Sequence, residues 1–540
     1  MSWTKLPTEL RNQILNYIFE DYLASVNDKD CPTISPYTTV SREWQCFFET
    51  ITFQNISLVI HDEGNLNKFA HSTSGDNARR RDYIRNISVI IVLPGYRCPD
   101  CQFPERAEEA ERNNHVFTQS MQALLGILST WTSSRHPYGL TLELNIKSAS
   151  DTEHHFNNHT MYDRYPLKHW NWSHRYHNME REERIGDRCC DEVSIWTNDD
   201  LISQGCCALE RYIGSLLEFT DIRLPRVKIV TSLLQRLQFK RQLSPSALRK
   251  LMQESLVQLS SLRLERWCMP TRTGEREYIR DFKNDFLPYL PESLQVVQYY
   301  AQRPTCLNLT PRGRVRPLCT LDLLSIQGHY FKEISVVEPE DSAVSLECLR
   351  HMAATSLSQP PITTSWHMLE RVCFSTKLFY DYDIQGRLIR GPNNDLLKTS
   401  ASMAQMMPSL RSWEIYQVFR PDEGRLFRFS IQSPFSASIL WKCWWRKGMR
   451  RPAEPDFSFC PGVISAWDKV AVLRTGNNIT CLVDENESKH ERYQPPYENG
   501  RYGNIYDESI FELNPLHPFT GHLAQWWTED QLLDMFENYT

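Results

Sequence analysis

The feature that most constrains this fold is a unit of one helix followed by one strand, which recurs along most of the chain. Within residues 114–131, Phe117, Met121 and Leu125 recur at helical spacing. Residues 140–146 then alternate strictly between apolar and polar side chains, as a strand with one buried face does. The order of the two patterns predicts a helix that packs beside the strand that follows it.

A second copy of the unit carries the local signals of a helix start. Ser244 stands where a helix N-cap is expected, and Pro245 follows at the first helical position. Leucines continue the helical spacing up to Leu259, and residues 262–264 read as the strand. Three further copies are predicted: a helix over residues 278–290 with a strand over 294–299, 346–357 with 369–374, and 396–407 with 410–416.

One helix and one strand every 25 to 45 residues, roughly, predict a stacked and curved solenoid whose strands pair in parallel. The array resembles an irregular leucine-rich repeat domain. A conventional two-layer α/β domain predicts the same alternation of helices and strands, and it remains the alternative fold.

The first fifty residues follow a different pattern, which predicts a small all-α module. After Pro7, apolar residues recur at helical spacing from Leu10 to Phe19. A second helix is expected over residues 39–49, where apolar and polar side chains divide between two faces. Because such a short module buries little core, part of its apolar surface is expected to dock on another protein or on the domain that follows.

This N-terminal pattern resembles an F-box. F-box proteins bind the Skp-type adaptor of a cullin-based ubiquitin ligase through the module and capture a target protein with the rest of the chain. The resemblance therefore implies a substrate receptor that catalyses nothing itself. The positions that match the pattern, and are expected to face the adaptor, are Leu6, Pro7, Leu10, Ile14, Ile18, Val40, Arg42, Trp44 and Phe48. The alternative is a helical cap on a protein-binding scaffold outside any ligase.

Residues 224–227, 233–245 and 262–267 are similar to a family of fungal F-box proteins with a long C-terminal region of unassigned function. The expected domains are an F-box-like module over residues 1–54, a repeat domain over 55–440 and a closing cap over 441–540. A polar, aperiodic surface insertion is expected at about residues 150–205. Within the cap, a strand is expected over 470–473 and a terminal helix over 529–539.

Composition narrows the classes of partner. The formal net charge is −6 over 540 residues, which argues against a dominant nucleic-acid surface. The basic and aromatic segment over residues 442–451 is expected to be a strand with inward-packed tryptophans that ends in a solvated loop. No apolar run approaches the length of about 18 residues that spans a bilayer, and the N-terminus does not read as a signal peptide. We expect an intracellular protein, in the cytoplasm or the nucleus, with reduced cysteines and protein partners.

The sequence offers little catalytic chemistry. Cys98 and Cys101 have half the spacing of a zinc site, but no second pair follows at a finger-like distance. A metal-dependent enzyme that adds His154, Cys189 or Cys206 as further ligands is the weakest alternative. No nucleophile elbow, phosphate loop, dinucleotide fingerprint or zinc-protease helix is present. We therefore predict no catalytic residue, no metal and no cofactor.

Overall fold

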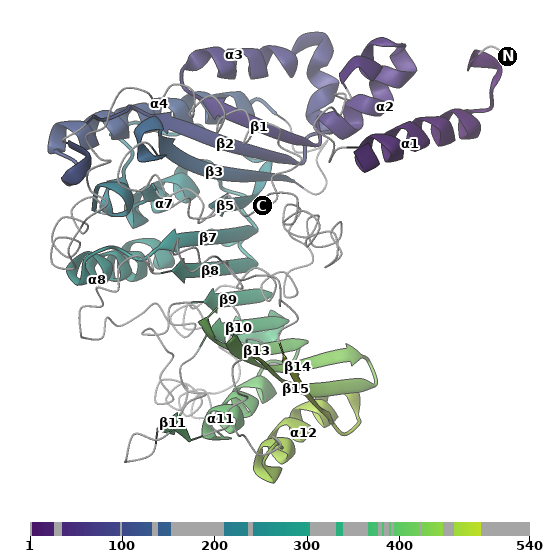
Figure 1. Cartoon of the computed structure of the whole chain (residues 1–540), viewed down its shortest axis with the longest axis vertical. Helices are drawn as coiled ribbons and strands as arrows, with labels where there is room; N and C mark the ends of the chain where they lie inside the picture. The colour runs from purple at the N-terminus through teal and green to yellow at the C-terminus, as the bar shows by residue number, and fades with distance from the viewer. Residues whose placement is uncertain are drawn as a thin grey trace.

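The computed structural model describes residues 3–25, 35–97, 100–131, 139–152, 210–235, 241–302, 331–337, 365–375, 381–382, 388–389, 394–420, 423–445 and 458–487. Within these residues the fold is mixed α/β and is organised around a 12-stranded, mostly parallel sheet. Figure 1 shows the strands following one another along the long axis of the molecule, with α4, α7 and α8 on one side of them. The expectation of an α/β fold with parallel strands is confirmed.

In the sheet, each strand lies next to the strand before it in the sequence. Nine parallel strands come first: β1 (Asn55–Ile60), β2 (Asn86–Leu93), β3 (Leu140–Ser148), β5 (Val230–Gln235), β7 (Ser261–Trp267), β8 (Val296–Gln302), β9 (Glu333–Val337), β10 (Arg371–Ser375) and β13 (Ser412–Arg420). Two short pairs stand apart, β4 (Leu216–Leu217) with β6 (Gln242–Leu243) and β11 (Asp381–Tyr382) with β12 (Leu388–Ile389).

One face of the sheet packs against the helices. The main core takes alternate residues of each strand, such as Leu142, Leu144 and Ile146 of β3, because successive side chains of a strand point to opposite faces. The covering helices are α3 (Glu63–Ser72), α4 (Ala107–Ser129), α7 (Pro245–Lys250), α8 (Arg272–Asp281) and α11 (Asn394–Gln405). A single continuous core therefore joins the sheet from β1 to its C-terminal strands.

The predicted units differ from the structure mainly at their ends. Ser244 caps α7 as expected, because its side-chain oxygen accepts from the backbone N–H of Ala247 at 3.0 Å, and Pro245 opens the helix. The helix expected over residues 278–290 begins earlier, as α8. It continues as a π-helical turn and then a 3-10 turn that ends at Tyr289. The helix expected over 346–357 and the terminal helix over 529–539 lie outside the described residues.

The C-terminal part extends the sheet. β14 (Glu423–Ser433) and β15 (Ser436–Trp445) run antiparallel, and β16 (Thr480–Glu487) then pairs in parallel with β15. The boundary expected at residue 440 falls inside β15. The strand expected over residues 470–473 is wrong, because these residues belong to α12 (Pro461–Thr475), which opens at Pro461 and ends at Gly476 in the left-handed conformation.

The α-helices α1 (Thr8–Ser25) and α2 (Arg42–Thr52) precede the sheet in the described part of the chain. α2 begins three residues later than expected because Ser41 is its N-cap and accepts from the backbone N–H of Trp44 at 3.3 Å. Figure 1 shows α1 beside α2 at the β1 end of the sheet, projecting away from the body. None of the helices in the described part of the chain is long and apolar enough to cross a membrane.

Candidate functional site: the exposed face of the N-terminal module

The N-terminal module has a small core of its own, separate from the main core. Leu15 of α1 and Phe48 of α2 are completely buried at its centre. The partly buried residues around them are Trp3, Ile18, Phe19, Tyr22, Tyr37, Trp44, Phe47 and Ile51. The two helices are therefore already packed against each other without help from the sheet.

Aromatic rings dominate this core. The ring of Trp44 lies 5.5 Å from that of Trp3 and 5.9 Å from that of Phe48, and Tyr37 stacks on Phe48 at 5.3 Å. Such ring pairs add stability beyond the apolar area they bury. They hold α2 against Trp3, which precedes α1, and against Tyr37 in the turn that precedes α2.

A polar contact closes the edge of the module. Glu43 of α2 accepts from Arg11 of α1 at 2.9 Å and from the indole N–H of Trp3 at 2.8 Å. The same carboxylate oxygen takes both donors, so one residue of α2 holds α1 and the turn before it. The rotation of α1 about its own axis is thereby restricted.

A second apolar face of α1 is left uncovered. Leu10, Ile14 and Tyr17 are 46%, 38% and 60% exposed, and they share one face because they are spaced four and three residues apart. Pro7, one turn earlier, is exposed on the same face. Val40, just before α2, is 58% exposed. We call Pro7, Leu10, Ile14 and Tyr17 the outer stripe.

The nine residues expected to face a partner divide into two groups. Pro7, Leu10, Ile14, Val40 and Arg42 are exposed. Leu6, Ile18 and Trp44 are half-buried and Phe48 is fully buried, so these four support the surface from inside instead of forming it. Tyr17 is absent from the predicted set, although its position three residues after Ile14 places it on the same face.

The sheet face opposite the helices is polar and offers a second candidate surface. Arg263 and Glu265 of β7 form an ion pair at 2.5 Å, and Gln298 of β8 donates to Glu333 of β9 at 2.6 Å. Burial raises the pKa of Glu333, against the influence of Gln298 and Arg371. Arg263 and Gln298 are more than nine-tenths buried, whereas Glu333, Ser335 and Arg371 are partly buried, so the polar side chains on β9 and β10 are more accessible than Arg263 and Gln298.

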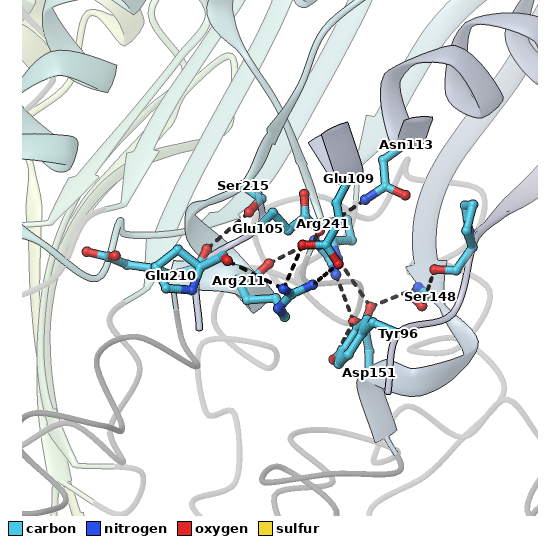
Figure 2. A network of polar contacts seen from close by, with 12 residues as sticks. Tyr96, Glu105, Glu109, Asn113, Ser148, Asp151, Glu210, Arg211, Ser215 and Arg241 are labelled. Carbon is cyan, nitrogen blue, oxygen red and sulfur yellow. Dashed lines mark hydrogen bonds and ion pairs between the residues drawn. The ribbon is translucent and has the colours of Figure 1, made fainter. Parts of the chain in front are cut away.

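A buried polar network lies at the end of β3, as Figure 2 shows. Arg241, which is 1% exposed, binds Asp151 at 3.0 Å and also contacts Glu105. Tyr96 donates to Asp151 at 3.2 Å, and Arg211 binds Glu109 at 2.9 Å. Asp151 was expected to belong to a surface insertion, but it is buried here; residues 153–209 lie outside the described residues.

The pKa values in this network follow from the pairing. Burial alone would lower the pKa of Arg241, but Asp151 and Glu105 outweigh burial and raise it. The hydrogen bond from Arg211 lowers the pKa of Glu109 despite burial. Burial, together with the nearby Asp151, raises the pKa of Tyr96. The raised pKa of Arg241 and the lowered pKa of Glu109 both favour the charged form, so the network is suited to holding distant segments together and not to proton transfer.

Comparison with known proteins bears on the C-terminal part of the chain. Residues 343–498 match a family of unknown function, DUF6546. This segment includes α11, α12 and the strands from β10 to β16. No F-box family and no leucine-rich-repeat family matched, and neither curated proteins nor solved structures gave a match.

Cys98 and Cys101 were considered only in the weakest alternative, a metal-dependent enzyme. Within the described residues, no group of three or more His, Cys, Asp or Glu side chains could hold a metal ion. Cys101 is buried, and Cys98, His154, Cys189 and Cys206 lie outside the described residues.

Proposed function

We propose that this chain is the substrate receptor of a cullin-based ubiquitin ligase. The N-terminal module would act as an F-box that binds a Skp-type adaptor, and the sheet domain would act as an irregular leucine-rich-repeat-like solenoid that holds the target protein. The chemistry of ubiquitin transfer would belong to other subunits. The proposal places the protein in the cytoplasm or the nucleus, where this machinery operates.

The outer stripe of α1 carries the proposal. Its residues remain exposed although the module has filled its own core with Leu15, Phe48 and the surrounding aromatic rings. Apolar side chains grouped on one helix face are a common feature of protein-docking surfaces. A helical cap that only closed the sheet would instead be expected to turn this face toward the sheet.

The strand order supports the second half of the proposal. Parallel strands that follow one another in sequence, with helices on one side, are the arrangement that a stacked repeat array produces. The polar side of the sheet near Glu333, Ser335 and Arg371 is the part we assign to target binding, because charged and polar side chains lie together there and remain partly accessible.

Co-purification of the full chain with a Skp-type adaptor tests the proposal. A stable one-to-one complex is expected, and Leu10→Asp and Ile14→Asp should each abolish it, since a charge would be forced into an apolar contact. Phe435→Asp is the matched control, because Phe435 is 75% exposed at the far end of the sheet. Full binding by folded Leu10→Asp and Ile14→Asp variants would remove the docking assignment. Absence of binding by the folded parent chain would favour a scaffold outside the ligase.

A further inference from the structure

The chain passes from the N-terminal module into the sheet within two residues. α2 ends at Thr52, and β1 begins at Asn55. The carbonyl oxygen of Gln54 between them accepts from the backbone N–H groups of Arg85 at 2.9 Å and Asn86 at 3.1 Å. The end of α2 is thus tied to the first residues of β2 as well as to β1.

Glu49, one turn before the end of α2, makes a polar contact across this junction with two arginines. Its side chain is 2% exposed. One carboxylate oxygen accepts from Arg79 Nε and Nη2 at 3.3 and 2.9 Å, and the other accepts from Arg80 Nε and Nη2 at 3.1 and 2.7 Å. Four charge-assisted hydrogen bonds to one buried carboxylate define its position and direction.

The two arginines belong to the sheet domain. They lie in the turn over residues Gly75–Asp82 that leads into β2. Arg80 also donates to the carbonyl oxygen of Ser72 at 3.2 Å and lies over the ring of Phe53. The adjoining Arg81 donates to the carbonyl oxygen of Thr73 and lies over the ring of Trp131, which follows α4. The turn is therefore held against α3 and the end of α4.

The outer stripe depends on α2 for its direction. α1 is held through the small core and through the contact of Arg11 with Glu43, and both of these involve α2. Any tilt of α2 against the sheet would consequently carry α1 with it.

We propose that Glu49, Arg79 and Arg80 form an orienting clamp that fixes the outer stripe relative to the sheet. The clamp would hold a partner bound on α1 and a partner bound on the sheet in one defined geometry, which a receptor needs in order to present its target. What the two surfaces bind rests on the proposed function, but the clamp itself is a property of the free chain. Glu49 is here a positioning residue and touches neither partner.

Distance measurements between pairs of spin labels test the clamp directly. Because the chain has 16 cysteines, the labels are attached through non-natural amino acids at exposed positions. One pair, at Arg42 of α2 and Gln122 of α4, reports on the module against the sheet domain. The other pair, at Asn16 of α1 and Arg42, reports on the module alone. Arg42 lies seven residues before Glu49, so a tilt of α2 by about 20° moves it by roughly 4 Å.

Two substitutions on the same helix should have opposite effects. Glu49→Ala is expected to widen the Arg42–Gln122 distance distribution and to leave the Asn16–Arg42 distribution unchanged. Glu43→Ala, which removes the contact to Arg11 within the module, is expected to widen the Asn16–Arg42 distribution and to leave the Arg42–Gln122 distribution unchanged. Arg79→Ala and Arg80→Ala each remove two of the four hydrogen bonds and should give a smaller widening of the first distribution, which keeps the test available if Glu49→Ala fails to fold.

An Arg42–Gln122 distribution that stays as narrow in the folded Glu49 and arginine variants as in the parent chain would overturn the clamp. Adaptor binding separates this result from a failure of the proposed function. Glu49→Ala should still bind the adaptor, since the outer stripe is intact. Leu10→Asp should leave both distributions unchanged while binding is lost.

Discussion

Leu15 of α1 and Phe48 of α2 are both completely buried in a core that the sheet does not share. Ile14, which precedes Leu15, is 38% exposed on a different face of the same helix. Two neighbouring apolar residues of one helix therefore have different tasks: Leu15 holds the module together, and Ile14 is available to a partner.

The different roles of Leu15 and Ile14 can be tested by measuring how much each side chain contributes to the stability of the module. Leu15→Ala should destabilise the module by about 2 to 5 kcal/mol, because it removes buried methyl groups and leaves a cavity. Ile14→Ala should change stability by no more than about 0.5 kcal/mol, because the side chain is exposed. Hydrogen exchange of peptides from residues 8–25 and 42–52 measures both, and equal protection in the two variants would contradict the assignment of the faces.

The contact at Glu49 predicts a pH dependence. Burial alone would raise the pKa of Glu49, but the hydrogen bonds from Arg80 and Arg79 outweigh burial and lower it below the ordinary value of 4.5. A carboxylate whose pKa is lowered by folding stabilises the folded state above the unfolded pKa and loses that contribution as the pH falls through the folded value. The stability difference between the parent chain and Glu49→Gln should be constant at neutral pH and shrink below about pH 4.5. Urea unfolding of both proteins across this pH range measures the stability difference. A difference that grew on acidification would contradict a lowered pKa of Glu49 in the folded state.

Arg241 and Arg106 provide a matched pair of ion-pair deletions. Arg241→Ala leaves the buried carboxylates of Asp151 and Glu105 without their cation and should destabilise the fold by about 3 to 5 kcal/mol. Arg106 pairs with Asp100 while 69% exposed, so Arg106→Ala should change stability by about 1 kcal/mol or less. Chemical unfolding of both variants tests whether burial decides the effect, and similar losses would show that it does not.

Two glycines should respond to alanine in opposite directions. Gly139 has a φ of +71°, and a Cβ at this position would lie 1.9 Å from the hydroxyl oxygen of Thr231, so Gly139→Ala should destabilise the fold by about 2 kcal/mol or more. Gly126 lies inside α4 with nothing within 4 Å of a built Cβ, so Gly126→Ala should stabilise the fold by about 0.5 to 1 kcal/mol. Thermal melts that move in the same direction would contradict this reasoning.

The alternation of helices and strands could be predicted from the sequence, because helical spacing and strict apolar–polar alternation are local signals. The same spacing could not show which apolar residues of the N-terminal module are buried and which are exposed. Trp44 and Phe48 recur on α2 as Leu10 and Ile14 do on α1, and only the packing of the two helices decides which of them is buried. The strand order was likewise left open between a solenoid and a two-layer domain, because strand pairing joins residues that are distant in sequence.

Two errors had different origins. The apolar run over residues 470–473 reads as a strand when taken alone, although Pro461 before it and Gly476 after it are the signals of a helix start and end. The burial of Asp151, which was expected in a surface insertion, had no local signal of this kind in the sequence. Its partner Arg241 is 90 residues away, so no local pattern marks the carboxylate as buried.

The order of the strands bears on how the chain is made. Each of the 12 strands is added beside the one before it, and none is inserted between two earlier strands. A ribosome releases the chain from its N-terminus, so every strand that emerges meets an edge that is already complete. The sheet can therefore be assembled in the order of translation, one edge at a time, without waiting for a later segment to arrive.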